Sequence, residues 1–190
     1  PDKPVTMGAY AMPELYTEAK YAQEMAIVNS KEVVAKVMEE FGKKFGRSYN
    51  VIEAYNTQKA DCVFVALGSV GENIKTAINE LKEQGKEAGL VSIRLLRPFP
   101  SDELISALKD KKRVVVIERV MPGGAANGPL FHEISSLMYL NGIDIKMENY
   151  IAGLGGRDIL PESFIDIFNG VIHKGDAAKE KNYDVIGVRG

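Results

Sequence analysis

The sequence predicts an α/β fold: a three-layer sandwich with a five-stranded, mixed and mostly parallel sheet, preceded by a long helical arm. From residue 50 onward, short β-rich runs alternate with helical stretches, which is typical of a parallel sheet covered by helices. The link between the first two runs, 55–62, is shorter than the roughly dozen residues that a parallel crossover needs, so the first strand is expected to be antiparallel. The third observation is the helical pattern of residues 14–45.

The predicted arm, residues 14–45, contains no proline and only one glycine, Gly42. An unbroken helix of this length would extend about 45–50 Å and would pack against another domain or subunit. Two ordinary helices are the alternative, with Ser30 as the N-cap of the second, because helices longer than about 25 residues are unusual in a small domain. The apolar residues that recur at helical spacing are Leu15, Ala19, Ala22, Ala26, Val33, Val37 and Phe41.

Five β-rich runs follow, at 51–55, 62–67, 90–96, 113–118 and 145–151, and a helical stretch follows each of the last four. We therefore expect an N-terminal segment and arm at 1–49, an α/β domain at 50–175, and a tail at 176–190 in which 185–188 docks on the body. The apolar stripes of the four helices are Ile74, Ala77, Ile78 and Leu81; Leu104, Ile105 and Leu108; Leu130, Ile134, Leu137 and Met138; and Phe164, Ile165, Phe168 and Ile172.

Composition excludes several classes of protein. The 190 residues are 45% hydrophobic and 26% charged, which suits one globular domain. With 24 basic and 26 acidic residues there is no basic surplus to bind nucleic acid or an anionic membrane, and no apolar run reaches the roughly 20 residues of a bilayer span. A single cysteine, Cys62, excludes a disulfide framework. The chain opens on Pro1 without a signal-peptide pattern, as expected for part of a longer polypeptide.

The first candidate loop is 67–72, which follows a strand and opens a helix, with Gly68, Ser69 and Gly71 as candidate ligand or interface residues. Ser69 and Glu72 have the spacing of a capping box. The same turn could bind an anion at the positive end of the helix, although it is neither a dinucleotide-binding fingerprint nor a P-loop. A structural turn is the favoured interpretation.

Two arginines, Arg94 and Arg97, lie at the end of the third run and are further candidates. Together they could hold a carboxylate or a phosphate through paired hydrogen bonds. The favoured alternative is that they pair with Glu118 or Asp158. Ser101 is then expected to cap the next helix.

Two glycine-rich loops follow the fourth and fifth runs. In the first, 118–128, the candidates Gly123, Gly124 and Asn127 would allow the backbone to approach a ligand or another chain closely. The second loop is 153–158, and its candidates are Gly155, Gly156, Arg157 and Asp158. There the glycines predict a corner with positive φ, Asp158 should cap the helix that starts near Pro161, and Arg157 should be free to pair across a boundary.

Residues with catalytic or metal-binding chemistry are scarce. His132 and His173 have no partners at the spacing of a metal site. Cys62 lies in a β-run with no neighbouring base, which favours a buried, inert thiol. There is neither a serine elbow nor a CxxC motif, so the sequence offers no candidate catalytic or cofactor-binding residue.

Three strings, VALGSVGENIKTAI, IRLLRPFP and NYIAGLGGRDI, resemble in this order the C-terminal half of the α subunit of 2-oxoacid:ferredoxin oxidoreductases. The pyruvate enzymes of that family are the most similar. The resemblance implies a domain like the C-terminal domain of transketolase, with strand order first, third, second, fourth, fifth. A crevice at the point where the order reverses would be lined by 68–71 and 121–127.

The resemblance also implies the activity of the whole enzyme. Such multi-subunit enzymes convert pyruvate and coenzyme A to acetyl-CoA and CO2 in anaerobic metabolism, using thiamine diphosphate, magnesium and iron–sulfur clusters, and pass electrons to ferredoxin. The expected partners are β, γ and δ subunits and a second α subunit, with ferredoxin as an indirect partner, in the cytoplasm. Neither nucleic acid nor a membrane is expected as a partner.

The family's catalytic groups have no counterpart in this sequence. They lie in the missing N-terminal half of the α subunit and in the β subunit, so no cofactor is expected in this chain. The sequence therefore predicts a structural and assembly domain that is inactive alone. A free-standing module that binds a small ligand or nucleotide through its glycine-rich loops, or a regulatory domain, is the alternative.

Overall fold

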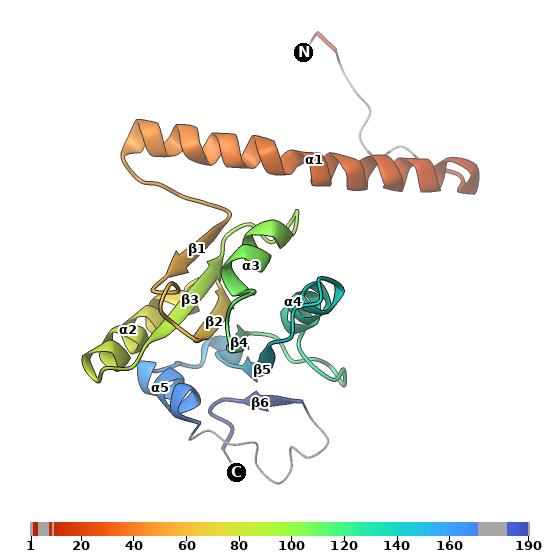
Figure 1. The fold of residues 1–190 in the computed structure, drawn as a ribbon. Helices are drawn as coiled ribbons and strands as arrows, with labels where there is room; N and C mark the ends of the chain where they lie inside the picture. Colours follow the sequence, from red (N-terminus) through yellow and green to blue (C-terminus); the bar gives the residue numbers. More distant parts are fainter. Residues whose placement is uncertain (1, 4–7, 9, 171–181, 190) are drawn as a thin grey trace. The chain divides into compact units, whose positions relative to one another are not determined.

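The computed structural model describes residues 2, 3, 8, 10–170 and 182–189. Their contacts divide the chain into two units, Pro1–Ser48 with Arg97–Phe99, and Tyr49–Leu96 with Pro100–Gly190 (Figure 1). His173, Ile172 and much of the predicted tail lie outside the described residues.

The first unit is built around a single helix, α1 (Pro13–Phe45), of 33 residues. Pro13 occupies its first turn, where the missing N–H is not needed, and Gly46 ends it with a left-handed φ of 68°. The alternative of two helices is wrong. Ser30 Oγ donates a hydrogen bond to Ile27 O at 2.6 Å, so its hydroxyl finds a partner inside the helix instead of capping a new one.

No residue of α1 is buried. In the apolar stripe expected from the sequence, Leu15, Val33 and Val37 are each more than half exposed, while Phe41 is half-buried. No helix in the described part of the chain combines the length and the apolar content that a bilayer span requires.

Among its described residues, the second unit contains a sheet of six strands in the order β1-β3-β2-β4-β5-β6. Its strands are β1 (Ile52–Tyr55), β2 (Cys62–Leu67), β3 (Ala88–Ile93), β4 (Arg113–Glu118), β5 (Lys146–Ile151) and β6 (Tyr183–Val185). Only β1 is antiparallel to its neighbour, β3. The expected order of the first five strands and the antiparallel edge strand are therefore confirmed.

The third strand lies earlier than predicted. It begins at Ala88 and ends at Ile93, instead of spanning 90–96. The strand includes Gly89. A side chain at this position would meet Thr57 Cα at 3.0 Å, so only glycine fits easily. The strand ends where the N–H groups of Arg94 and Leu95 both turn to Val51 O, at 2.9 and 3.0 Å.

The sixth strand, β6, was not predicted as a strand, although docking of 185–188 was expected. It pairs in parallel with β5, placing Tyr183 opposite Asn149 and Val185 opposite Ile151. Ile186 N continues the ladder by donating to Ile151 O at 2.8 Å. Three residues are too few to show a strand's alternating pattern, so this pairing follows from tertiary contacts alone.

Helices cover both faces of the sheet. On one face α2 (Val70–Glu83) packs beside α5 (Pro161–Asn169), and on the other α3 (Ser101–Leu108) lies next to α4 (Pro129–Leu140) (Figure 1). The core joins α2 and α5 to the sheet, with Phe64 and Phe164 edge-to-face at 6.0 Å between ring centroids. The three-layer sandwich predicted from the sequence is confirmed.

Candidate functional site at the carboxyl edge of the sheet

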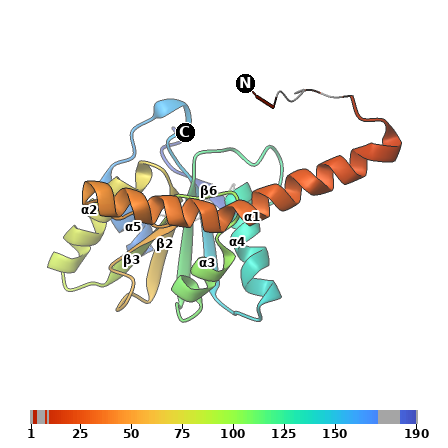
Figure 2. The same ribbon diagram turned by 90° about the horizontal axis from the view of Figure 1, so that it is seen from above.

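Strands β2 to β6 run in the same direction, so their carboxyl ends meet at one edge of the sheet, here called the carboxyl edge. Figure 2 shows the loops after β4 and β5 and the C-terminal end of the chain on this side. The loops are tied together: Arg119 Nε donates to Gly153 O at 3.2 Å, and Asn73 Nδ2 donates to Ile159 O at 2.9 Å.

The loop after β2 is a turn held by its own backbone. Gly68 has a φ of 70°, and the N–H groups of Gly71 and Glu72 donate to Gly68 O and Ser69 O. The predicted capping box is wrong, because Ser69 has helical dihedral angles and its hydroxyl makes no cap, while Glu72 pairs with Lys75. Gly71 serves packing: a side chain there would lie 3.3 Å from Ser92 Oγ on β3.

Arg94 forms an ion pair with Glu53 on the neighbouring strand β1. It contacts Glu53 Oε2 at 2.5 Å and lies over the ring of Tyr49 at 5.2 Å. Lys75 Nζ lies 2.9 Å from the other oxygen of Glu53. The hydrogen bond from Lys75 keeps the pKa of Glu53 below its usual value; burial opposes this effect, and the charge of Arg94 adds to it. The expected pairing of Arg94 with Glu118 or Asp158 is wrong, because the antiparallel edge strand β1 brings Glu53 beside it.

Arg97 belongs to the segment that groups with the first unit, where its guanidinium lies 5.9 Å from the centroid of the Phe99 ring. The helix that follows begins at Ser101, with Pro100 at the N-cap position and no side-chain cap. The expected cap by Ser101 is therefore wrong, since this serine is already helical.

A buried carboxylate, Glu118, anchors the loop after β4. Its Oε2 accepts Leu130 N at 2.8 Å, and its Oε1 accepts Phe131 N at 3.2 Å and Asn149 Nδ2 at 2.9 Å. Asn149 Oδ1 in turn accepts Gly128 N at 2.8 Å. Glu118 thus stabilises the first turn of α4 from a distance in sequence, a role that the sequence analysis missed.

The middle of this loop is exposed, while its end is fixed. Gly123 and Gly124 have φ values of 62° and 93°, and no atom lies within 4 Å of where their side chains would begin. Asn127 is buried and donates from Nδ2 to Asn182 O at 2.9 Å. Asn127 therefore binds the segment that leads into β6, whereas the candidates Gly123 and Gly124 are exposed.

The loop after β5 is a glycine corner, as predicted. Gly153, Gly155 and Gly156 have φ values of 74°, 62° and 81° around the short helix η1 (Leu154–Gly156). Arg157 Nη1 donates to Gly187 O, so one donor of this exposed guanidinium serves the domain itself, and its pairing across a boundary stays a prediction. The cap by Asp158 is also wrong: α5 has Leu160 at its N-cap position and no side-chain cap, because Asp158 lies too far before the first turn.

We expect Gly155→Val to lower the free energy of unfolding by about 1–2 kcal/mol, because a β-branched residue is strained at positive φ. The space around Gly155 is open, so any loss reports backbone strain and not a clash. Gly155→Asn is the matched control, since asparagine tolerates the left-handed region and should cost clearly less. Urea unfolding measures both; equal losses for the two variants would contradict this explanation.

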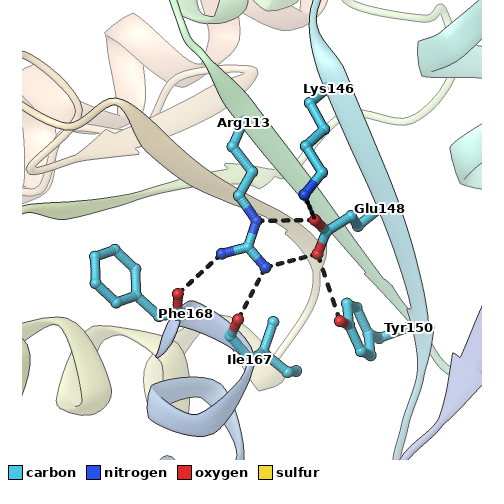
Figure 3. A network of polar contacts seen from close by, with 6 residues as sticks. All are labelled: Arg113, Lys146, Glu148, Tyr150, Ile167 and Phe168. Carbon is cyan, nitrogen blue, oxygen red and sulfur yellow. Dashed lines mark hydrogen bonds and ion pairs between the residues drawn. The ribbon is translucent and has the colours of Figure 1, made fainter. Parts of the chain in front are cut away.

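At the opposite edge of the sheet, Arg113 holds a second polar network (Figure 3). Its guanidinium contacts both oxygens of Glu148, at 3.1 and 2.6 Å, and donates to Phe168 O and Ile167 O at 2.9 and 2.8 Å. Lys146 Nζ lies 2.9 Å from Glu148 Oε1. Arg113 therefore joins β4, β5 and the end of α5, and a cavity of about 540 Å³ lies beside it, lined also by Asn149, Asn169 and Asp184.

The pKa values around this network follow from burial and charge. Burial alone would raise the pKa of Glu148, but Arg113 and Lys146 outweigh it and hold that pKa below its usual value. Burial, together with the charge of Glu148, raises the pKa of Tyr150 to about 12. Burial also raises the pKa of Cys62 to about 11, so its thiol stays neutral near neutral pH, as expected for an inert cysteine.

The described residues do not fit the cofactors that the family resemblance implies. No group of three or more His, Cys, Asp or Glu among them is placed to hold a metal ion such as the magnesium of thiamine diphosphate. An iron–sulfur cluster needs several thiolates, and the chain has one buried cysteine. The buried carboxylate at the carboxyl edge, Glu118, already accepts three hydrogen bonds.

A six-stranded sheet whose carboxyl-edge loops are tied to one another defines a doubly wound α/β domain. The family model described as pyruvate:ferredoxin oxidoreductase core domain II matches residues 60–164, and the chain belongs to this family.

Relatives agree with this assignment. Pyruvate synthase subunit PorA of Methanocaldococcus jannaschii is 40% identical over 173 residues, which are 90% of this chain and 43% of the relative. Ketoisovalerate oxidoreductase subunit VorA of Pyrococcus abyssi is 39% identical over 158 residues, 83% of this chain and 40% of the relative. The chain thus spans less than half the length of these curated relatives.

The chain is also similar to one solved structure, with 20% identity and a TM-score of 0.49. That structure is 2-oxoglutarate:ferredoxin oxidoreductase from Magnetococcus marinus with 2-oxoglutarate, coenzyme A and succinyl-CoA bound. The match covers 70% of this chain and 21% of that chain.

Proposed function

We propose that this chain is an assembly domain within the α subunit of a 2-oxoacid:ferredoxin oxidoreductase, with pyruvate as the substrate of the whole enzyme. The observation that carries the proposal is the family match over residues 60–164, which lies within the α/β unit. Relatives named as pyruvate synthase subunits support pyruvate, and a ketoisovalerate relative of similar identity shows that this domain is shared among enzymes for different 2-oxoacids.

Assembly is favoured over catalysis because three charged groups that could have served a site, Glu118, Arg94 and Arg113, are engaged within the domain itself. Glu118 caps α4, Arg94 pairs with Glu53, and Arg113 pairs with Glu148. Thiamine diphosphate, magnesium and the iron–sulfur clusters of the whole enzyme are then held by other parts of it, and coenzyme A is its second substrate. The proposed reaction gives acetyl-CoA and CO2, with electrons passed to ferredoxin in the cytoplasm.

The proposed organisation keeps the boundaries expected from the sequence: an N-terminal arm at 1–49, the α/β domain at 50–175 and a tail at 176–190. The arm would pack on another domain or subunit, because α1 buries none of its residues and exposes an apolar stripe that includes Leu15, Val33 and Val37. The proposed partners are the β, γ and δ subunits and a second α subunit.

The isolated chain is expected to bind thiamine diphosphate negligibly and to reduce no electron acceptor with pyruvate and coenzyme A, because no group of three or more His, Cys, Asp or Glu among the described residues is placed to hold a metal ion. Calorimetric titration with thiamine diphosphate and magnesium, and a viologen-reduction assay, measure the two properties. The complete oxidoreductase serves as the positive control. Micromolar binding of the cofactor by this chain would contradict the proposal and favour a ligand-binding module.

A further inference from the structure

Exposed apolar side chains of the α/β unit are concentrated at the carboxyl edge. Among the residues that the structure describes, seven large apolar side chains of this unit are exposed, and five of them lie on loops at this edge. The remaining two, Tyr139 and Leu140, lie at the C-terminal end of α4. The five form what we call the carboxyl-edge patch: Val120 (42% exposed), Met121 (45%), Leu154 (37%), Leu160 (60%) and Val188 (69%).

The patch residues come from three segments that contact one another. Arg119, next to Val120, donates to Gly153 O, next to Leu154. Arg157 donates to Gly187 O, next to Val188. The segments are therefore neighbours in space, and the exposed glycines between them, Gly123 and Gly155, leave room for another backbone to approach closely.

The three loop segments that carry the patch bear more basic than acidic side chains, and the exposed Glu162 lies two residues beyond Leu160, in the first turn of α5. These described segments are 119–128, 152–160 and 186–189. They carry three exposed basic residues, Arg119, Arg157 and Arg189, and one acidic residue, Asp158. This local surplus contrasts with the net charge of -2 of the whole chain. Two copies of the patch facing each other would bring like charges together, which is unfavourable in an interface.

We propose that the carboxyl-edge patch binds a non-identical polypeptide surface that presents apolar residues flanked by carboxylates. That surface belongs to the part of the oxidoreductase that the relatives possess and this chain does not span. The positive charge of the three loop segments favours an acidic partner. This chain covers only 40–43% of the relatives' length, so the whole enzyme contains further polypeptide that can provide such a partner. The inference rests on the proposed function and assigns it a surface.

Photo-crosslinking in the assembled oxidoreductase tests this surface. A benzoylphenylalanine residue replaces Met121 in the patch, and Tyr139, which is 83% exposed at the far end of α4, carries the same probe as the control. We expect the probe at Met121 to crosslink to a peptide outside residues 1–190, at least about tenfold more than the probe at Tyr139. A crosslink to a second copy of this chain, or equal crosslinking from both positions, would overturn the proposal.

The charge requirement is tested with Arg157→Glu and Arg157→Lys in the same assembled enzyme. The glutamate variant should reduce the Met121 crosslink about tenfold, while the lysine variant should retain most of it. Equal effects of both variants would overturn the acidic nature of the partner. If no further polypeptide co-purifies with the chain, the proposed function fails; if the oxidoreductase assembles but the crosslink is absent, only the assignment of this surface fails.

Discussion

Replacing Glu118 by alanine is expected to lower the free energy of unfolding by about 3–5 kcal/mol, the largest loss we expect from a single substitution in this domain. The carboxylate is only 6% exposed and accepts hydrogen bonds from Leu130 N, Phe131 N and Asn149 Nδ2. The alanine variant leaves these donors without their acceptor in a buried site and opens a cavity beside the first turn of α4.

The matched control for this substitution is Glu118→Gln, which keeps the shape of the side chain and one acceptor oxygen. It should cost clearly less than alanine, because at least one of the two backbone N–H groups keeps its partner. Gly128→Ala approaches the same network from the other side, since its side chain would lie 2.1 Å from Glu118 Oε1. Urea unfolding measures all three; a loss below about 1 kcal/mol for Glu118→Ala would contradict the anchoring role of this network.

Arg113→Met is expected to destabilise the domain by about 2–4 kcal/mol near neutral pH. The substitution keeps the length and apolar stem of the side chain but removes both contacts to Glu148 and the donors to Ile167 O and Phe168 O. Glu148 is only 17% exposed, so without Arg113 its charge would remain partly buried with Lys146 as its nearest cation.

The effect of Arg113→Met should depend on pH in a defined direction. The pKa of Glu148 is lower in the folded domain than in the unfolded chain, so the ionised carboxylate contributes stability above its ordinary pKa of 4.5. That contribution is lost as the pH falls through the folded pKa. The difference between wild type and Arg113→Met should therefore shrink between about pH 7 and pH 3, and Glu148→Gln should remove most of this dependence. A difference that stays constant over this range would contradict the pairing.

Patterns local in sequence predicted much of the fold. The β-rich runs 62–67 and 113–118 match β2 and β4 residue for residue, and the short link before Cys62 correctly indicated the antiparallel edge strand. The strand order came from the family resemblance and not from the pattern. The short strand β6 was missed because its three residues gain their structure only by pairing with β5.

Helix caps were predicted less well. Ser69, Ser101 and Asp158 each have the residue type of a cap near a helix start, but a cap also needs the right backbone dihedral angles and the right position. Ser69 has helical dihedral angles, Ser101 is already within its helix, and Asp158 lies before the N-cap residue Leu160. A shift of one or two residues is enough to remove the bond.

The candidate site was predicted only in outline. The glycine loops and their common edge follow from the sequence, but the partners of Arg94 and Glu118 are distant in sequence and depend on how strands and helices pack. The carboxyl-edge patch was overlooked because isolated apolar residues in loops, such as Val120 and Leu154, look like core residues in sequence. Their place beyond the ends of β4 and β5 was the signal available.

The measurement that tests the assembly role most directly compares assembly with turnover in the complete oxidoreductase carrying Met121→Asp, with Tyr139→Asp as the control for an exposed residue elsewhere. Native mass spectrometry gives the assembled fraction, and steady-state kinetics gives kcat and KM for pyruvate and coenzyme A per assembled enzyme. We predict that Met121→Asp lowers the assembled fraction at least about fivefold while kcat and both KM values stay within about twofold. Full assembly with a tenfold or greater fall in kcat, or a comparable rise in KM for coenzyme A, would contradict the account and make this edge part of the catalytic site.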